Sequence, residues 1–434
     1  MFQDKIVHYQ LDNGLQVLLD PVPSIPIVSN WIWYRVGARN EMPGLTGISH
    51  WVEHMMFKGT DRYPKGQIFK TVNINGGILN GFTGQDYTAY FETLPADRLE
   101  LALQIESDRM ANSIFDQQEV EAERTVIIAE REGNENSPNY LLYEEVAAAA
   151  FKLHPYGHPV IGWKEDLLTI TREALWQHYK TYYGPHNAVL VISGDIDLDS
   201  VTDQIADLYG PIPAGPPVPS MNITEPSQNG MRRVSVQRPG TMPYFQAGYH
   251  VPAGQHPDSY ALMVLDFLLT GADTMGGMSG GTRTHRSARL YQSLVETQTA
   301  VRASSNYRPS IDAGTFFLAG TPAKGNSLQI LEDAFLAEID KLQQSPPTEA
   351  EIQRIIKQTK AQYAYGLESP ANRAHWLGMM EVINHWQACL TFLDSLAAVR
   401  PDDVQRVAQT YLHRNNCTIG WFEPQTTNQH RESE

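Results

Sequence analysis

The segment His50-x-x-Glu53-His54 brings together three side chains that can carry out metal chemistry. On a helix, His50 and His54 are one turn apart on the same face, so both imidazoles can bind a single Zn²⁺. Glu53 then stands within reach of a metal-bound water as a general base. Thr46 or Ser49 can cap such a helix. Two histidines on a helix can also be ordinary polar residues, but the apolar surroundings favour a ligated pair because burying unpaired polar groups is costly.

A catalytic zinc normally has three protein ligands and one open position, so the sequence must supply another ligand. The stretch 117–131 has helical spacing and places Glu119, Glu123 and Glu130 on one face. A solvated acidic stripe is the ordinary explanation for such glutamates. The run 126–129, Val-Ile-Ile-Ala, is too apolar for a fully exposed helix. A buried carboxylate on this helix is therefore expected to pair with a cation.

The elements that must position these residues are a mixture of strands and helices. Runs rich in Val, Ile, Trp and Tyr predict buried strands at 27–36, 86–94 and 189–194. Helical spacing of apolar residues predicts helices at 99–113, 117–131, 142–151 and 172–182. The two types do not alternate as in a doubly wound fold. We therefore predict an α+β fold in which helices cover mainly antiparallel sheets.

A proline-rich segment divides the chain near its middle. Five prolines between residues 211 and 219 exclude a helix or a central strand, which predicts an extended linker over 211–230. The segment 182–191 before the linker resembles the segment 411–420, because each ends a helical pattern in Tyr, turns through Asn and enters a β-like run. We expect two homologous domains at 1–210 and 231–434.

The composition excludes several classes of function. The net charge of −16 is unfavourable for binding nucleic acid or anionic membranes, and no stretch is apolar enough to span a bilayer. Cys389 and Cys417 are too few for a disulfide framework or a cysteine zinc site, and they are expected to be reduced core residues. The glycine-rich stretch 269–281 lacks the Gly-Lys-Ser/Thr ending of a phosphate loop, and we expect a mobile loop there instead. We expect a cytoplasmic protein.

Taken with its context, the His50-x-x-Glu53-His54 motif resembles that of the pitrilysin/insulinase family of zinc peptidases, in particular its two-domain branch with the mitochondrial processing peptidases. The resemblance extends over most of the chain through the segments 57–60, 80–88, 123–126, 154–157 and 159–162. It implies that His50, His54 and Glu130 bind Zn²⁺, that Glu53 is the general base, and that Glu123 orients the site.

The same resemblance implies that a peptide substrate binds as an added β-strand. The run from Asn80 to Glu92 is expected at the edge where this strand pairs, with Asn80, Gly81, Phe82 and Thr83 contacting substrate. An ordinary edge strand is the alternative. Unfolded peptides or targeting presequences are the substrates that the family implies.

Active members of the family also have an Arg and a Tyr seven residues apart in the C-terminal domain. The segment 288–296 sets the register and places Val295 and Arg302 at these positions, and no Arg between 280 and 310 has a Tyr seven residues later. We therefore expect the zinc subunit of a heterodimeric endopeptidase whose homologous partner carries the Arg and Tyr. The alternatives are a non-catalytic zinc-binding scaffold subunit and a self-sufficient homodimeric peptidase.

Overall fold

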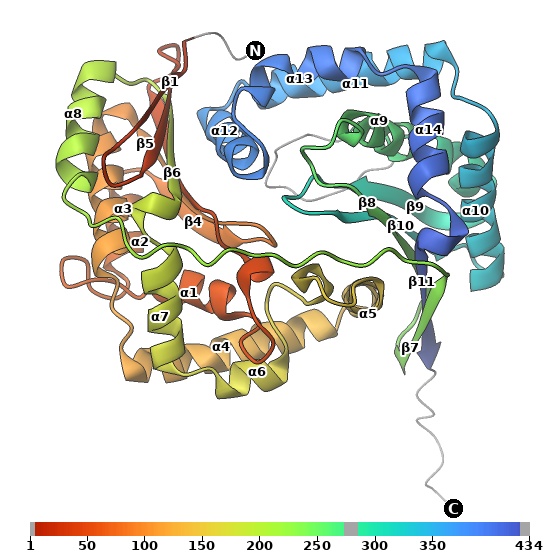
Figure 1. Cartoon of the computed structure of the whole chain (residues 1–434), viewed down its shortest axis with the longest axis horizontal. Helices are drawn as coiled ribbons and strands as arrows, with labels where there is room; N and C mark the ends of the chain where they lie inside the picture. The colour runs from red at the N-terminus through yellow and green to blue at the C-terminus, as the bar shows by residue number, and fades with distance from the viewer. Residues whose placement is uncertain (1–4, 273–284, 426–434) are drawn as a thin grey trace, which may run out of the picture. The chain divides into compact units, whose positions relative to one another are not determined.

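The computed structural model describes residues 5–272 and 285–425, and the chain forms two compact units (Figure 1). The described residues of the first unit come from 1–131, 158–223 and 363–391, and those of the second from 132–157, 224–362 and 392–434. Each unit is built on one β-sheet. In the described part of the chain, no helix combines the length and the apolar character needed to cross a bilayer.

The sheet of the first unit has the strand order β1-β2-β6-β3-β5-β4. Strands β2 and β6 are parallel, and every other neighbouring pair is antiparallel. The strands are β1 (Val7–Gln10), β2 (Gln16–Pro21), β3 (Ile27–Tyr34), β4 (Ile78–Thr83), β5 (Thr88–Pro95) and β6 (Ala188–Gly194). The side chains of β3 are buried from Val28 to Tyr34, which requires cover on both faces of the sheet.

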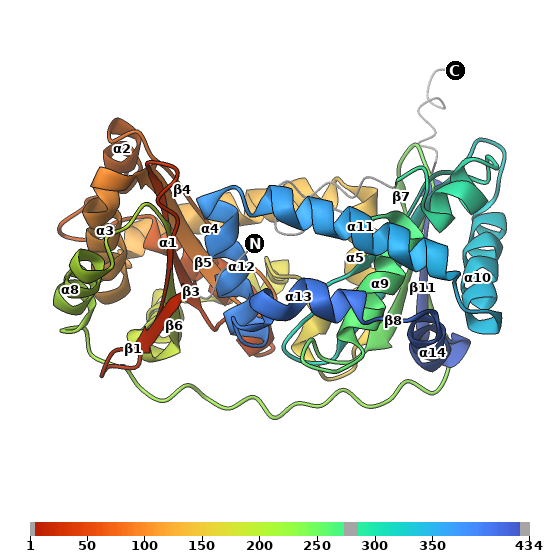
Figure 2. The same ribbon diagram turned by 90° about the horizontal axis from the view of Figure 1, so that it is seen from above.

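Helices cover both faces of this sheet, and those on the two faces come from different halves of the sequence. Alternate residues of a strand face opposite sides, so Ile32 and Tyr34 pack into the core formed with α1 (Ile48–Met56) and α3 (Leu99–Asn112). The other face of β3 and β6 packs against α12 (Pro370–Ile383) (Figure 2). The remaining helices of this unit are α2 (Gln67–Ile74), α6 (Lys164–Thr169), α7 (Arg172–Tyr182) and α8 (Leu198–Tyr209), while α4 (Gln117–Glu135) begins in this unit and ends in the second.

The sheet of the second unit repeats this topology. Its strand order is β7-β11-β8-β10-β9, with β7 and β11 parallel and the other pairs antiparallel. If β1 is left aside, the first sheet has the order β2-β6-β3-β5-β4. In both sheets the five strands, numbered one to five along the chain, then lie in the order 1-5-2-4-3. The strands are β7 (Arg232–Pro239), β8 (Tyr244–Val251), β9 (Ala300–Tyr307), β10 (Gly314–Pro322) and β11 (Cys417–Gln425). The predicted α+β class with two related, mainly antiparallel domains is confirmed.

The helices of the second unit include one from the N-terminal half of the sequence. Helix α5 (Pro138–Ala150) packs on β7, β8 and β11. The other helices are α9 (Ser259–Thr270), α10 (Leu328–Gln344) and α14 (Pro401–Tyr411), while α11 (Glu349–Gly366) and α13 (Ala388–Ala397) have residues in both units. The predicted ranges 1–210 and 231–434 follow the order of the chain, whereas the compact units exchange α5 and α12 between its two halves.

Most predicted elements are present close to their expected bounds. The structure has helices α3, α4, α5 and α7 and strands β3, β5 and β6 where the sequence predicts them. The run from Asn80 to Glu92 is not a single edge strand, because a turn after Thr83 separates β4 from β5. No helix or strand lies between Tyr209 and Arg232. Cys389 and Cys417 are buried free thiols, and the predicted glycine-rich loop lies outside the described residues from 273 onward.

Candidate metal centre

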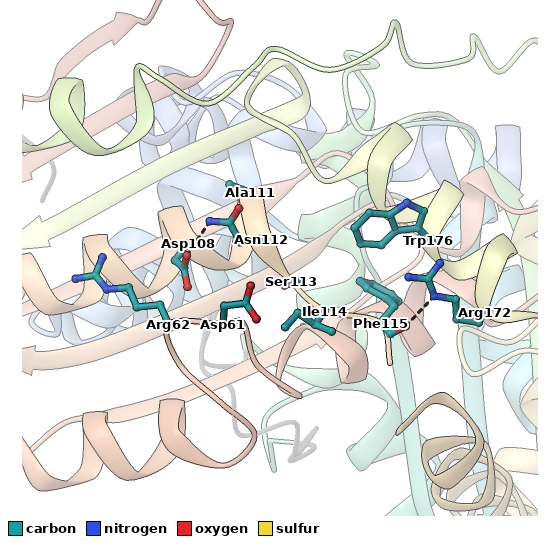
Figure 3. Close-up of a pocket in the computed structure, with 10 residues that line it drawn as sticks. All are labelled: Asp61, Arg62, Asp108, Ala111, Asn112, Ser113, Ile114, Phe115, Arg172 and Trp176. Carbon is teal, nitrogen blue, oxygen red and sulfur yellow. Dashed lines mark hydrogen bonds between the residues drawn. The ribbon is translucent and has the colours of Figure 1, made fainter. Parts of the chain in front are cut away.

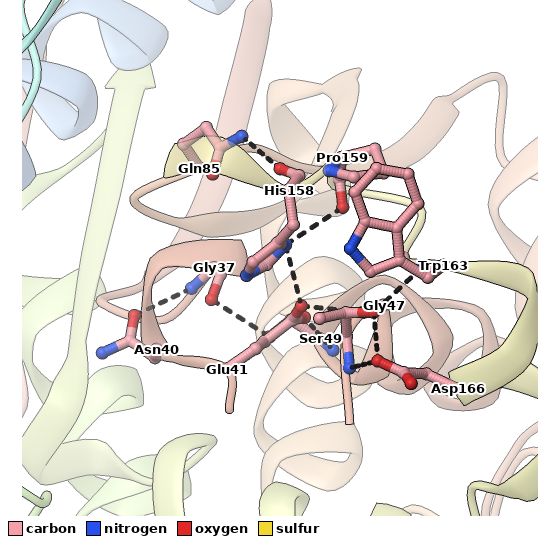
Figure 4. Close-up of polar contacts among 12 residues, drawn as sticks. Gly37, Asn40, Glu41, Gly47, Ser49, Gln85, His158, Pro159, Trp163 and Asp166 are labelled. Atoms are coloured by element: carbon pink, nitrogen blue, oxygen red, sulfur yellow. Dashed lines mark hydrogen bonds and ion pairs between the residues drawn. The ribbon is translucent and has the colours of Figure 1, made fainter. Parts of the chain in front are cut away.

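Helix α1 carries the two histidines on one face, with their ring centroids 4.6 Å apart. The predicted Thr46 or Ser49 cap is wrong, because the N-cap residue is Gly47 with φ +86° and it provides no side-chain hydrogen bond. The buried carboxyl group of Glu41 instead accepts hydrogen bonds from the backbone N–H groups of Gly47 (2.7 Å) and Ser49 (2.8 Å) (Figure 4). Burial raises the pKa of Glu41 to about 8, so this carboxyl group caps α1 by accepting hydrogen bonds from two free N–H groups of its first turn.

The third donor comes from Glu130 on α4. Its Oε2 lies 3.9 Å from His50 Nε2 and 3.7 Å from His54 Nε2. Zinc bonds of about 2.1 Å in tetrahedral geometry separate ligand atoms by about 3.4 Å. One nitrogen or oxygen of each of the three residues lies within 4.8 Å of the others, and in the described part of the chain this is the one such group of three. The donor set and its spacing therefore fit a zinc ion.

Glu123 binds His54 through the ring nitrogen that faces away from Glu130. Its Oε1 lies 2.8 Å from His54 Nδ1, and its other oxygen pairs with Lys58. A proton on Nδ1 donated to this carboxylate leaves the lone pair of Nε2 on the side of Glu130. Burial favours a higher pKa for Glu123, but the hydrogen bonds from His54 and Lys58 outweigh burial and lower the pKa. Glu123 is therefore an ionised acceptor at neutral pH.

Only one of the two histidines has a pKa shift that favours metal binding. Burial, followed by the neighbouring His54, lowers the pKa of His50 to about 3, so this imidazole is neutral at pH 7. Burial also acts to lower the pKa of His54, but the hydrogen bond to Glu123 and the nearby carboxylates raise it overall. Neutral imidazoles and ionised carboxylates are the forms that bind zinc.

Glu53 lies beside the ligands on α1 and is 7% exposed. Burial raises the pKa of its carboxyl group, and a hydrogen bond from the Thr83 hydroxyl (2.7 Å) opposes this effect. Thr83 is the last residue of β4, so the sheet edge and the helix meet at this hydrogen bond. The contact fixes one oxygen of Glu53 and leaves the other available to a water.

Strand β4 holds the four residues predicted to contact substrate. It is the last strand of its sheet, with β5 on one side and no strand of the described chain on the other. Asn80 is exposed, and its Oδ1 accepts a hydrogen bond from the Gly81 N–H. A Cβ on Gly81 would lie 2.8 Å from the Tyr90 ring and 3.1 Å from the Phe57 ring, so only glycine fits. Phe82 packs edge-on against Trp31 and Trp33.

The two positions expected to hold the Arg and Tyr lie in the second unit. Val295 is the last residue of a short π-helical segment, Tyr291–Val295, and Arg302 lies on β9. Neither side chain is of the expected type. Residues that sequence reasoning did not identify are Glu41, which caps α1, and Lys58, which pairs with Glu123. Lys58 lies in one of the family-like segments, whereas no sequence signal pointed to Glu41.

A separate surface pocket of about 540 Å³ lies in the first unit. Charged residues line it, including Asp61, Arg62, Asp108 and Arg172, together with Phe115 and Trp176 (Figure 3). Arg172 donates to the backbone carbonyl of Phe115 (2.8 Å) and lies over the Trp176 ring. None of the predicted site residues lines this pocket, which distinguishes it from the metal centre.

Comparison with known proteins agrees with this geometry. Residues 16–164 match the family model described as insulinase (peptidase family M16), and residues 169–359 match the model described as the peptidase M16 inactive domain. The zinc protease PqqE of Helicobacter pylori is 27% identical over 420 residues, covering 95% of this chain and 92% of the relative. The probable mitochondrial-processing peptidase subunit beta of Arabidopsis thaliana is 26% identical, covering 95% of this chain and 77% of the relative.

The fold has a close counterpart among solved structures. The crystal structure of a protease from Helicobacter pylori superimposes with a TM-score of 0.91 at 27% identity. The superposition covers 97% of this chain and 99% of that chain. Both domains of the fold are therefore shared with a protein of similar length.

Proposed function

Because the chain belongs to the insulinase family, peptidase family M16, we propose that it is a zinc-dependent endopeptidase subunit that hydrolyses unfolded peptides. The observation that carries this proposal is the convergence of His50, His54 and Glu130. A buried Glu53 stands next to them on α1. A histidine pair, a carboxylate and a neighbouring general base are the set that metal-assisted peptide hydrolysis needs. The names of the relatives as zinc proteases support the same assignment.

When bound, zinc supplies a Lewis acid that lowers the pKa of an attacking water to about 7. Glu53 accepts the proton of that water and later donates it to the leaving amine. Thr83 holds the Glu53 carboxylate in place for both transfers through its 2.7 Å hydrogen bond. Glu123 fixes the ring orientation and tautomer of His54. The chain itself thus provides binding, orientation and proton transfer.

The free edge of β4 is the proposed binding place for the peptide. Backbone groups of an edge strand can pair with an extended chain, which selects substrates by shape more than by side chain. Asn80, Gly81, Phe82 and Thr83 lie on this strand, and Thr83 links it to Glu53. Peptide paired along β4 would therefore pass close to the general base.

We further propose that activity requires a homologous partner that carries the Arg and Tyr. Val295 and Arg302 cannot provide this pair. The Arabidopsis relative is named as the beta subunit of a processing peptidase, which supports division of labour between subunits. A non-catalytic zinc-binding scaffold and a self-sufficient homodimer are the competing hypotheses. A buried Glu53 held by Thr83 favours catalysis over a scaffold, because a purely structural zinc site needs no general base.

The test is hydrolysis of a quenched fluorescent basic peptide by the zinc-loaded chain, alone and mixed with a homologue that carries the Arg and Tyr. We expect activity only in the mixture, and Glu53→Gln should lower it by about 10²- to 10⁴-fold while zinc remains bound. Full activity of the chain alone would contradict the need for a partner. Zinc binding without hydrolysis in either sample would support the scaffold hypothesis instead.

A further inference from the structure

We propose that residues 161–170, which we term the brace segment, set the distance between the two helices that carry the metal ligands, and that Arg124 and Arg131 are the positioning residues that hold it. The proposal rests on the proposed ligands His50, His54 and Glu130. These come from α1 and α4, which are separate in sequence, so their spacing depends on contacts outside the site. The brace segment contacts both helices.

On the side of α1, the brace segment packs backbone against backbone. A Cβ on Gly47 would lie 2.3 Å from the carbonyl oxygen of Ile161, and a Cβ on Gly162 would lie 2.2 Å from the carbonyl oxygen of Thr46. Both glycines have positive φ, +86° and +84°. The start of α1 and the start of the brace segment therefore meet at a separation that no other residue type permits.

Hydrogen bonds also join the brace segment to the residue that precedes the N-cap of α1. Asp166 accepts hydrogen bonds from the Thr46 N–H (3.1 Å) and the Thr46 hydroxyl (2.6 Å). The Thr46 hydroxyl oxygen in turn accepts a hydrogen bond from the backbone N–H of Trp163 (2.9 Å). Three hydrogen bonds thus join Thr46, the residue before the N-cap of α1, to Trp163 and Asp166 of the brace segment. Thr46 lies four residues before His50.

On the side of α4, two arginines bind the brace segment. Arg131 donates from Nη1 to the carbonyl oxygen of Gly162 (2.8 Å), and its guanidinium lies 5.4 Å from the centroid of the Trp163 ring. Arg124 donates to the carbonyl oxygens of Leu167 and Ile170, the latter at 2.9 Å. Both arginines thus use backbone carbonyls, whose positions do not depend on side-chain rotamers.

The order of residues on α4 shows how these contacts bear on the site. Arg124 directly follows Glu123, and Arg131 directly follows Glu130, so the Glu-Arg pair recurs after seven residues, about two helical turns. The glutamates face His50 and His54, whereas the arginines bind the brace segment. Each carboxylate of the site is therefore anchored through the residue next to it.

Arg124 also reaches α1 directly. Its guanidinium carbon lies 4.7 Å from the centroid of the Trp51 ring, and Trp51 follows His50. Since a shift of about 1 Å in a ligand changes metal geometry and reactivity, loss of these contacts should weaken the site without removing a ligand. Ordinary packing of a surface segment is the alternative, and it predicts a loss of stability only.

The experiment measures zinc affinity by competition with a chelator, and the visible spectrum of the cobalt-loaded protein, for wild type, Arg124→Gln, Arg131→Gln and the double variant. We expect the double variant to bind zinc about 10- to 100-fold more weakly and to show altered cobalt bands. Arg172→Gln is the matched control, because Arg172 also binds one backbone carbonyl, that of Phe115, and one indole, that of Trp176 (Figure 3), and neither of these residues belongs to α1 or α4. Its zinc affinity should stay within about twofold of wild type.

An unchanged affinity and spectrum in the folded double variant would overturn the proposal, as would an equal loss in Arg172→Gln. Arg131→Lys keeps a donor and the charge, so it should fold and show an intermediate loss if the glutamine variants do not fold. Wild-type protein that binds no zinc, or His50→Ala that binds it as well as wild type, would overturn the metal site itself. Zinc bound by wild type and lost in His50→Ala, with unaffected arginine variants, would overturn the brace segment alone.

Discussion

At the scale of single residues, Glu119, Glu123 and Glu130 have three different environments, although their spacing in the sequence predicts that they share one face of α4. Glu119 pairs with Lys65 at 2.7 Å, Glu123 pairs with Lys58 and His54, and Glu130 faces both histidines. Only Glu130 lacks a nearby lysine or arginine among the ion pairs of the described residues. The lack of a fixed cationic partner is what makes Glu130 suitable as a metal ligand.

Glu123→Gln should weaken zinc binding by about 10- to 100-fold, because an amide holds the Nδ1–H of His54 less firmly than a carboxylate does. The ligands themselves stay in place, so the stoichiometry should remain one zinc per chain. Chelator competition measures the change. Glu119→Gln, on the same helix but paired with Lys65, is the control and should leave zinc affinity unchanged. Equal loss in both variants would point to a general effect of charge on α4.

The sequence predicted part of this site and not the rest for a physical reason. His50, Glu53 and His54 follow from the spacing of one helix, which local geometry determines. Choosing among Glu119, Glu123 and Glu130 needed the resemblance to a known family, because their partners lie 54 to 80 residues earlier in the chain. Glu41 had no local signal, since it caps α1 from six residues before Gly47.

At the scale of elements, α7 supports α1 through a buried histidine. His178 Nε2 lies 3.0 Å from the Ser49 hydroxyl, and burial lowers the pKa of His178 to about 3. The imidazole is therefore neutral in the folded protein at pH 7. Ser49 precedes His50, so this contact joins α7 to the metal-bearing helix.

This histidine should make the protein sensitive to acid. Its folded pKa lies below the ordinary value of 6.5, so its contribution to stability is fully present above pH 6.5 and is lost as the pH falls toward 3. The free energy of unfolding should fall by about 1.4 kcal/mol per pH unit from this residue, or about 2 kcal/mol by pH 5. Urea unfolding of metal-free protein at pH 7 and pH 5 measures the loss. His178→Gln should lose about 2 kcal/mol less over this range, and an equal loss would contradict the prediction.

Helix α12 can pack closely on its sheet because residue 378 is a glycine and has no side chain. A Cβ on Gly378 would lie 2.0 Å from Trp33 Nε1. Alanine favours a helix over glycine by about 1 kcal/mol, but overpacking at this site costs about 1–3 kcal/mol, so Gly378→Ala should lower the free energy of unfolding. Gly133→Ala on α4 is the control, because a Cβ there meets nothing within 4 Å and should add about 0.5–1 kcal/mol. Urea unfolding distinguishes the two signs.

Single elements were predictable because their signals are local. The predicted helix 172–182 coincides with α7 (Arg172–Tyr182), and the predicted strand 189–194 is β6 less its first residue. The prediction failed at the turn between β4 and β5, where the run from Asn80 to Glu92 has strand-like residues on both sides. The partner of each element was not predictable, since the contact of α12 with β3 joins residues more than 300 positions apart.

At the scale of the whole molecule, each sheet is completed by a helix from the other half of the sequence. Helix α12 brings Arg373 to the first sheet, where it forms two hydrogen bonds with the buried Asp20 at 2.6 and 2.7 Å. Helix α5 brings Val146 to the second sheet, where a Cβ on Gly420 would lie 2.3 Å from it. Two halves with the same topology are thus not two independent folding units.

A chain cut within the linker should therefore fold only when both pieces are present. The fragment 1–220 lacks α12, which leaves one face of β3 uncovered and removes the two hydrogen bonds that Arg373 donates to Asp20. Near-UV circular dichroism and thermal unfolding should show no cooperative transition for either fragment and a cooperative one for the mixture. Fragment 221–434 with Arg373→Gln should restore the mixture less well, because the exchanged helix then leaves Asp20 unpaired. A cooperative transition for fragment 1–220 alone would show that the N-terminal half folds without the exchanged helix.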